Sequence, residues 1–184
     1  FQASRLIESR VQELVKRYGR ETVELGFEEQ FNYTERLMLA ELKELPDGEW
    51  EFDDYGDQDV MKEGKPPIRV HCKMIKKGTK ISFDWSGSDP QPNASWGCSR
   101  ATLIGGNFLG FMICFPGLFP LNHGIIRNIE IISKAGTCVD VDALAPTTGY
   151  CSGAFDKIEA VAIGCLAGPL ASVQPWRVYP AAVS

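Results

Sequence analysis

The sequence predicts an α+β fold, with a mainly antiparallel sheet, an N-terminal helix pair and further helices packed on the sheet. Apolar residues recur at helical spacing before Pro46-Asp47-Gly48 and alternate with polar residues after it. Helices and strands then follow one another in groups, without the regular alternation of a parallel α/β protein. We therefore expect a helical segment over residues 1–48 and an α+β domain over residues 49–184.

The composition is that of a folded globular protein. The chain has 184 residues, of which 44% are hydrophobic, and this is enough to form a core. Its formal net charge is −5 and it has no long run of Lys or Arg, which argues against nucleic acid or a membrane surface as a partner. No apolar leader follows Phe1, so we expect a cytoplasmic protein.

Six cysteines are scattered singly through the sequence, without a C-x-x-C pair. This pattern favours reduced, mostly buried thiols and argues against a zinc site within these residues, so we assign no metal ligand. The apolar stretch 103–121 is broken by several glycines and by Pro116. It predicts a buried helix followed by a turn, and not a membrane span.

Two helices are predicted at the start of the chain. The first covers residues 3–18 and ends at Gly19, which suits the left-handed conformation common at helix C-termini. The second covers about residues 21–45, with acidic residues early and a lysine late. We expect a break in it near Gly26 or Asn32.

The strands begin after the second helix. Residues 49–53 form a short predicted strand, followed by an acidic loop over 53–59. Residues 68–74 and 80–85 alternate in polarity on either side of a tight turn at Gly78, which predicts a hairpin.

The remaining elements are a buried helix over 99–114, strands over 125–132 and 138–141, and a helix over 155–170 that ends at Gly168-Pro169. The glycines of the first of these helices should let another backbone approach. Both helices are so apolar that they would leave exposed patches unless other chain covers them, so we expect this piece alone to associate.

Polar residues gather where the second hairpin strand ends. In the run Ile81–Gln91, the alternating strand residues lead directly into a Ser-Gly-Ser-Asp-Pro turn. We predict catalytic roles for Asp84 and Asp89, because carboxylates can orient water or transfer protons. The predicted substrate-binding residues here are Ser86, Ser88, Gln91 and Asn93. The alternative is that these side chains only form Asx-type turn bonds.

A second polar segment is Asn122-His123-Gly124, just before a predicted strand. His123 can act as acid, base or ligand and is the third predicted catalytic residue, with Asn122 as a substrate-binding residue. The alternative is a surface or capping histidine. His71 lies on the strand face opposite Val70 and Cys72, and we expect a solvated residue without a role.

These segments, in their order, resemble the hydantoinase B/oxoprolinase family over nearly the whole chain. The matching runs are Tyr33-Thr34-Glu35-Arg36, Pro46-Asp47-Gly48, the run 50–55, the run 83–94 and Pro120-Leu121-Asn122-His123-Gly124. Two departures are visible: the segment between Gln91 and Asn93 is shorter than in the family, and Thr147-Thr148-Gly149-Tyr150-Cys151-Ser152-Gly153 replaces a small-residue motif after the last strand. The family's N-terminal region, which would supply metal ligands, is also absent from these residues. Since family members are several times longer, the resemblance implies an internal fragment of a larger subunit.

The resemblance implies part of a B-type subunit in ATP-dependent hydrolysis of a cyclic amide such as a hydantoin, oxoproline or a lactam. ATP-dependent carboxylation of a ketone is the alternative within the family. A third reading is a non-catalytic scaffold, with Trp85, Trp96 and Trp176 as interface anchors.

The resemblance also implies ATP and a divalent metal in the whole complex. It implies two partners, which are an A-type ATP-binding subunit or domain and the rest of the B-type subunit. The sequence holds no phosphate-binding loop, so ATP is expected to bind outside these residues.

Overall fold

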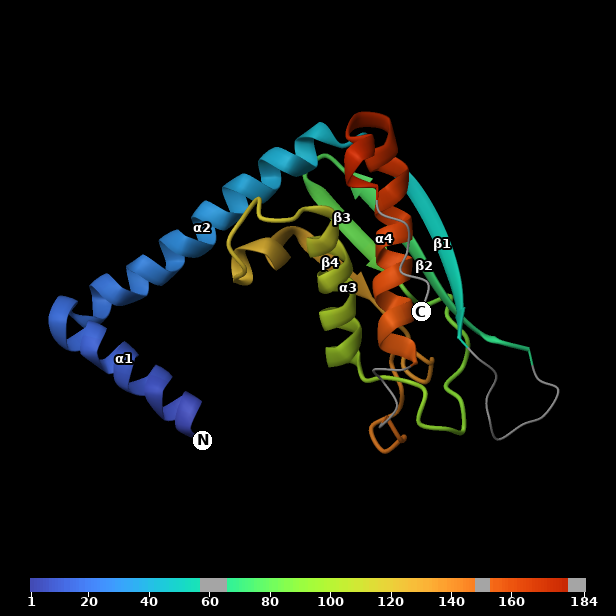
Figure 1. Cartoon of the computed structure of the whole chain (residues 1–184), viewed down its shortest axis with the longest axis horizontal. Helices are drawn as coiled ribbons and strands as arrows, with labels where there is room; N and C mark the ends of the chain where they lie inside the picture. The colour runs from blue at the N-terminus through green and yellow to red at the C-terminus, as the bar shows by residue number, and fades with distance from the viewer. Residues whose placement is uncertain (57–65, 148–152, 179–184) are drawn as a thin grey trace.

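The sheet is four-stranded in the order β1-β2-β3-β4 (Figure 1). The computed structural model describes residues 1–56, 66–147 and 153–178. The strands are β1 (Gly48–Gly56), β2 (Ile68–Lys77), β3 (Lys80–Asp84) and β4 (Ile129–Ile132). β2 pairs antiparallel with β1 and β3, whereas β3 pairs parallel with β4. The predicted α+β fold with a mainly antiparallel sheet is confirmed, including the hairpin.

Two helices form an arm that projects from the sheet (Figure 1). They are α1 (Gln2–Tyr18) and α2 (Arg20–Glu44), joined at Gly19. The backbone N–H of Gly19 donates to the carbonyl of Val15 at 2.9 Å, and no residue of α1 is buried. The predicted break in the second helix is wrong, because α2 passes through Gly26 and Asn32. One glycine costs an exposed helix only about 1 kcal/mol, which a long helix tolerates.

The C-terminal part of α2 is anchored to the rest of the molecule at two places. The first is a 3₁₀ helix, η1 (His123–Asn128), whose Arg127 donates to Glu35 Oε2 of α2 at 3.0 Å. The second is the predicted Pro-Asp-Gly turn. The buried Lys76 Nζ donates to the carbonyl of Leu45 and, at 2.8 Å, to Asp47 Oδ1. The turn is therefore fixed to β2 by a buried cation.

Two further helices, α3 (Arg100–Cys114) and α4 (Ala154–Val173), lie together on one face of the sheet (Figure 1). Glycines bring them close, as expected. A Cβ built at Gly110 would lie 2.8 Å from the carbonyl oxygen of Glu159, and one at Gly106 would lie 3.0 Å from Ile158. Gly105 has nothing within 4 Å, so only part of the glycine set serves this contact.

The two faces of the sheet differ in character. The face under α3 and α4, called the covered face, holds the core. Its strand residues Val70, Cys72, Met74, Ile81 and Phe83 are each at most 1% exposed. Neither α3 nor α4 lies on the opposite side, called the open face, where the alternating residues of the same strands are polar or charged, apart from Ile75. There Lys73 Nζ lies 2.7 Å from a carboxylate oxygen of Glu49.

Three predicted strand boundaries are wrong. Residues 123–128 form η1 in place of the first part of a strand, and only Ile129–Ile132 pair with β3. Around residues 137–140 there are isolated bridges, with no continuous strand. β1 continues to Gly56, so Asp53 and Asp54 belong to the strand, while residues 57–59 of the predicted acidic loop lie outside the described part.

The last helix also ends later than predicted. Pro169 lies inside α4, which continues to Val173. A proline removes one backbone donor, and here the remaining turn is kept by packing, since Pro169 and Leu170 are both buried. Its neighbour Gly168 packs against the Trp50 ring. A Cβ at position 168 would lie 2.2 Å from Trp50 Cδ1, so this contact requires glycine.

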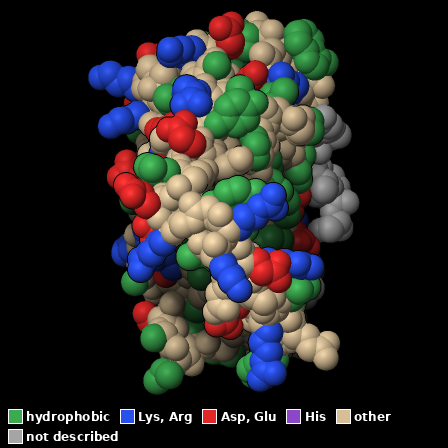
Figure 2. Space-filling model, turned by 90° about the vertical axis from the view of Figure 1, so that its left-hand side faces the viewer, with side chains coloured by type: hydrophobic (Ala, Val, Ile, Leu, Met, Phe, Trp, Pro, Cys, Tyr) green, Lys and Arg blue, Asp and Glu red, His purple; other side chains and the backbone are tan. Residues whose placement is uncertain are grey.

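The last helix leaves no apolar patch, because the rest of this chain covers it and most apolar residues of α4 are buried in the core. Exposed apolar side chains lie on the arm, for example Ile7 and Leu25, at Leu121, and on α3 at Ile104 and Leu109. On the arm side of the molecule they are interspersed with charged side chains of both signs (Figure 2). Association of the isolated piece stays a prediction.

Five of the six cysteines are free and buried, as predicted: Cys72, Cys98, Cys114, Cys138 and Cys165. Burial raises the pKa of the Cys114 thiol to about 12, so this thiol is unreactive at neutral pH. Cys151 lies outside the described residues. Among the described helices, none has both the length and the apolar character to cross a membrane.

The three tryptophans proposed as interface anchors differ in exposure. Trp85 is fully buried and its Nε1 donates to Asn107 Oδ1 at 3.1 Å, so it is a core residue and cannot anchor a partner. Trp96 is half-buried and packs close to Gly56 and Gly153. Trp176 is 73% exposed and is the one of the three that a partner could contact.

Candidate functional site

The candidate site begins where β3 stops short of β2. β3 ends at Asp84, so the backbone of Arg69 and His71 has no strand partner on that side. The following turn supplies the missing partners, as buried backbone groups require. Ser88 Oγ accepts from His71 N at 3.1 Å and donates to His71 O at 3.0 Å. Asp89 Oδ2 accepts from Arg69 N at 2.8 Å, and Asp89 N donates to Arg69 O at 3.0 Å.

The turn itself is closed by another predicted residue. Asp84 Oδ1 accepts from the backbone N–H of Ser86 at 2.9 Å, which is an Asx turn. Asp84 thus makes the Asx-type bond of the turn-bond alternative, whereas the side chains of Ser88 and Asp89 bond to the backbone of β2. Their catalytic and substrate-binding roles stay predictions. What the turn demonstrably does is bring Gly87 to the open face beside β2.

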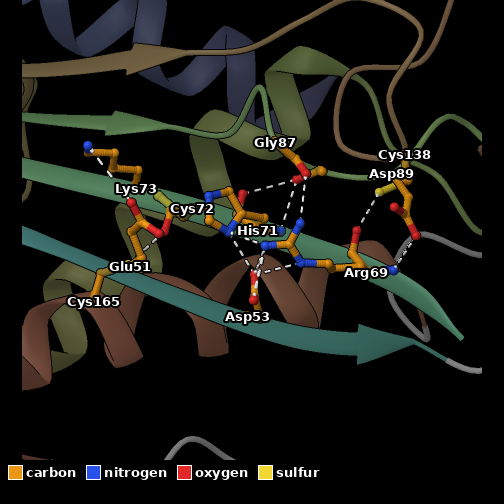
Figure 3. Close-up of polar contacts among 11 residues, drawn as sticks. Glu51, Asp53, Arg69, His71, Cys72, Lys73, Gly87, Asp89, Cys138 and Cys165 are labelled. Atoms are coloured by element: carbon orange, nitrogen blue, oxygen red, sulfur yellow. Dashed lines mark hydrogen bonds and ion pairs between the residues drawn. The ribbon is translucent and has the colours of Figure 1, made fainter.

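Three charged or titratable side chains meet on the open face next to this turn, and we call them the Asp53 cluster: Asp53 from β1, and Arg69 and His71 from β2 (Figure 3). Arg69 Nε and Nη2 donate to the two oxygens of Asp53, each at 3.0 Å. His71 Nδ1 lies 2.7 Å from Asp53 Oδ1. Asp53 and His71 face each other directly across the two strands, so the register brings them together.

The electrostatics of the cluster keep Asp53 ionised. Burial alone would raise the pKa of the Asp53 carboxyl. Hydrogen bonds and charge from Arg69 and His71 outweigh burial, so the pKa lies below its usual value. Correspondingly, the hydrogen bond to Asp53 raises the pKa of Arg69. At neutral pH the cluster is a carboxylate held by a guanidinium and an imidazole.

The imidazole has two neighbours that compete for the same nitrogen. Nδ1 of His71 lies 2.7 Å from Asp53 Oδ1 and 2.9 Å from Arg69 Nη2. It carries a proton when it donates to the carboxylate, and none when it accepts from the guanidinium. The cluster therefore has two hydrogen-bonded arrangements that differ in the tautomer of His71.

Gly87 packs against the His71 ring. A Cβ at position 87 would lie 2.4 Å from His71 Cδ2, so only glycine leaves room for the ring in this position. The His71 side chain is 14% exposed, and the described residues offer its Nε2 no hydrogen bond. An imidazole held at Nδ1 by a carboxylate, with Nε2 free of a hydrogen bond to the described residues, can take up or release a proton at Nε2.

Two other predicted binding residues lie further along the turn. The side-chain amide of Gln91 makes two hydrogen bonds to Asp142. Its Nε2 donates to Asp142 Oδ2 at 3.0 Å, and its Oε1 accepts from Asp142 N at 2.8 Å. Asn93 is exposed. Gln91 therefore joins two loops, while Asn93 presents an amide to solvent.

The second predicted segment lies elsewhere. β3 and β4 are parallel, and η1 leads into the amino end of β4, whereas Asp84 lies at the carboxyl end of β3. His123 is exposed. Its ring lies edge-on to the ring of Phe31 of α2, with 5.9 Å between the ring centroids. Asn122 Oδ1 caps η1 at Gly124 N, and its Nδ2 donates to Thr34 Oγ1 at 2.8 Å. The structure thus does not bring His123 and Asn122 to Asp84 and Asp89.

Sequence reasoning missed His71, Arg69 and Asp53. His71 was expected to be solvated and without a role, but its side chain is mostly buried within the Asp53 cluster. The signal was present in the strand alternation, which puts Arg69 and His71 on one face. The missing information was the β1–β2 register and the length of β1, because Asp53 was assigned to the end of a short strand.

The divalent metal implied by the family resemblance was tested against these side chains. Among the residues that the structure describes, no group of three or more His, Cys, Asp or Glu side chains is arranged to hold a metal ion. In the Asp53 cluster the carboxylate is already bonded to a guanidinium, whose positive charge opposes a cation. The described residues therefore do not fit such a metal.

Comparison with known proteins identifies the family. The family model described as hydantoinase B/oxoprolinase matches residues 1–182. The chain belongs to the hydantoinase B/oxoprolinase family. It is 30% identical over 189 residues to the B-type subunit of a putative D-/L-hydantoinase from Pseudomonas sp. (strain NS671), covering 96% of this chain and 30% of that protein. It is 23% identical to an uncharacterized protein of Methanocaldococcus jannaschii, covering 76% of this chain and 24% of that one.

Solved structures show the same fold. The ATP-dependent caprolactamase from Pseudomonas jessenii superposes with a TM-score of 0.76 at 21% identity, covering 92% of this chain and 28% of that chain. An acetone carboxylase in its nucleotide-free form superposes with a TM-score of 0.69 at 16% identity, covering 79% of this chain and 21% of that chain. The chain spans less than a third of the length of each of these relatives.

Proposed function

We propose that this chain is part of a B-type subunit that hydrolyses a cyclic amide in an ATP-dependent reaction. The observation that supports it is the 30% identity to the B-type subunit of a putative hydantoinase over nearly the whole chain. The fold shared with an ATP-dependent caprolactamase agrees with this proposal. We assign ATP to an A-type partner subunit or domain, the divalent metal to other parts of the B-type subunit, and the complex to the cytoplasm.

Within that reaction we propose a proton-transfer role for His71. Ring opening breaks the amide C–N bond, adds the hydroxyl of water to the carbonyl carbon and delivers a proton to the nitrogen. His71 has one ring nitrogen, Nε2, without a hydrogen bond among the described residues, and its side chain is 14% exposed. Asp53 and Arg69 are positioning residues, because they hold the other ring nitrogen.

The first experiment tests the activity itself. The full-length polypeptide that contains this chain is co-purified with its ATP-binding partner and assayed with hydantoin, 5-oxoproline and ε-caprolactam. We expect ADP and the ring-opened product to form in equal amounts with at least one of them. ATP-dependent turnover of none of the three cyclic amides would contradict the proposal.

The second experiment tests His71 in the same complex. His71→Gln should lower kcat by about 10²–10⁴-fold, the usual contribution of a general acid or base. Asp53→Asn should shift the pH dependence of kcat with a smaller loss. Lys73→Ala, on the same face but outside the cluster, is the matched control and should leave kcat unchanged. Full turnover in His71→Gln would remove the catalytic role.

Ketone carboxylation is the second candidate, and the fold shared with acetone carboxylase favours it. The same complex, supplied with acetone, bicarbonate and ATP, distinguishes the two reactions. Carboxylated product, with no turnover of cyclic amides, would establish the carboxylase.

A scaffold role is tested by the residues predicted from the sequence. Asp89→Asn and His123→Ala are introduced into the complex, and assembly is measured alongside turnover. Loss of turnover with intact assembly supports their predicted catalytic roles. Unchanged turnover in these variants and in His71→Gln supports a scaffold.

A further inference from the structure

The sheet ends at β4, whose outer edge has no partner strand among the described residues (Figure 1). In a parallel pair, alternate residues of a strand direct both their N–H and their C=O to the same neighbour. The Ile132 carbonyl accepts from Trp85 N at 2.9 Å, on the β3 side. The backbone groups of Glu130 therefore also point to β3, whereas those of Ile129 and Ile131 point outward. β4 is thus an edge strand with two outward residues.

Two of these four outward backbone groups are already bonded. The N–H of Ile129 donates to the carbonyl of Ile126, at the end of η1. The carbonyl of Ile131 accepts from Arg100 Nη2 at 3.2 Å. The other two groups, the Ile129 carbonyl and the Ile131 N–H, have no hydrogen bond to the described residues. Unpaired backbone groups at a sheet edge are a template for another strand.

The two unpaired groups fit a parallel strand better than an antiparallel one. In a parallel pair, one residue of the added strand donates to the Ile129 carbonyl and accepts from the Ile131 N–H. An antiparallel pair needs both backbone groups of one residue, and each outward residue has one group already bonded, to Ile126 or to Arg100. A dimer that joins two copies of this edge about a two-fold axis perpendicular to the sheet is antiparallel. A second copy therefore does not suit this edge.

An apolar groove lies beside the edge, between α3 and β4 on the covered side. Its volume is about 200 Å³. The apolar residues that line it are Ile104, Phe108, Ile126, Ile129 and Ile131. Side chains of an added strand alternate in step with those of β4. The residue opposite Glu130 would therefore point to the open face, and its two neighbours would point into the groove. Glu130 is exposed and has no ion pair among the described residues, which favours a basic residue opposite it.

We propose that the edge of β4 and this groove bind an extended segment of the longer subunit, which adds to the sheet parallel to β4. The segment carries a basic residue between two apolar ones. The chain spans less than a third of its relatives, so most of such a subunit lies outside these residues. A parallel strand needs a long crossover connection, which suits a segment distant in sequence. The proposal concerns assembly and does not depend on the reaction of the complex.

Photo-crosslinking in the full-length polypeptide, purified in its complex, identifies the occupant. p-Benzoylphenylalanine replaces Glu130 or Ile132, which are both exposed at the edge. We expect both positions to cross-link to one segment of the same polypeptide. The residue reached from position 132 should follow that reached from position 130 by about two residues, as in a parallel pair. Leu109, exposed on α3 outside the groove, is the matched control position and should not reach that segment. The reverse order, or cross-links to a second copy, to the A-type partner or to nothing, would overturn the proposal.

Amide hydrogen exchange in the same complex tests the hydrogen bonds. The Ile131 N–H should exchange roughly 100-fold more slowly than an unprotected amide. Proline in place of the segment's basic residue removes the donor to the Ile129 carbonyl, and exchange at Ile131 should then rise about tenfold. Proline at the next residue, whose N–H points away from β4, is the matched control and should leave this exchange unchanged. The Glu130 N–H, bonded to β3, should stay protected in each variant. Fast exchange at Ile131 in the unmodified complex would overturn the proposal.

Discussion

The two faces of the sheet differ in the side chains that they present and in how far these are buried. On the covered face, β2 and β3 present apolar side chains that are almost completely buried under α3 and α4. On the open face, β2 presents Lys73, which pairs with two glutamates of β1, and, further along, the Arg69 and His71 side chains that meet Asp53 of β1. Alternating residues of one strand thus contribute either to stability or to candidate chemistry. Substitutions on the two faces should differ accordingly.

The largest contrast is expected between Phe83 and Lys73. Phe83→Ala removes a fully buried ring and should lower the free energy of unfolding by about 3–5 kcal/mol. Lys73→Ala removes an exposed ion pair on the open face and should not change the urea midpoint measurably. Urea unfolding followed by tryptophan fluorescence measures both. Similar losses for the two variants would mean that the open face is buried by other chain.

The next effect concerns the contact between α4 and β1. A Cβ built at Gly164 would lie 2.4 Å from the ring of Phe52, so Gly164→Ala forces helix and strand apart. We expect a loss of about 1–3 kcal/mol in the free energy of unfolding. Gly105→Ala is the matched control, because nothing lies within 4 Å of its Cβ position. That variant should be neutral or slightly stabilising, since alanine is the better helix former. Equal destabilisation of the two variants would contradict the packing argument.

A smaller loss of stability is expected for Gly87→Ala, the corresponding substitution on the open face. Gly87→Ala should displace the His71 ring, which can turn toward solvent, so the loss of stability should be smaller than for Gly164→Ala. A double-mutant cycle isolates the contact. In a His71→Ala background, Gly87→Ala should have no further effect on the urea midpoint. Additive effects of the two substitutions would show that Gly87 serves another purpose.

The smallest effect is the pH dependence contributed by Asp53. Its pKa in the folded protein is lower than in the unfolded chain, so its ionised form stabilises the fold. This contribution is complete above the unfolded pKa of about 4 and is lost as the pH falls through the lower folded value. Asp53→Asn should therefore show a weaker decrease of the urea midpoint below about pH 4 than the natural chain. An identical decrease would assign the acid sensitivity to other carboxyls.

Comparison of sequence and structure shows which features local patterns determine. The hairpin was predicted because it depends on alternation and a glycine turn, which are both local. The continuation of α4 through Pro169 was not predicted, because it depends on burial against strands that are distant in sequence. Residues 125–128 were read as strand, but they belong to η1, which lies against α2, and this contact is also distant in sequence.

The candidate site divides in the same way. The turn after β3 was located from its composition, but the partner of each side chain was not. Ser88 and Asp89 bond to the backbone of β2, and this could be recognised only once β3 was known to be shorter than β2. Asp53 and His71 are 18 positions apart in sequence and meet only through the strand register. No local pattern contains that information.

Gly19 determines the direction of α1 relative to α2. Gly19 joins α1 to α2 with φ 82° and ψ 151°, a combination that is essentially restricted to glycine. At about 1.5 Å per residue, the 17 residues of α1 reach roughly 25 Å beyond this joint. A change of backbone angle at one position would therefore sweep the tip of α1 through a wide arc, while every contact in the sheet stayed as it is. In relatives, the residue at the position of Gly19 should indicate whether the first helix takes the same direction relative to the second.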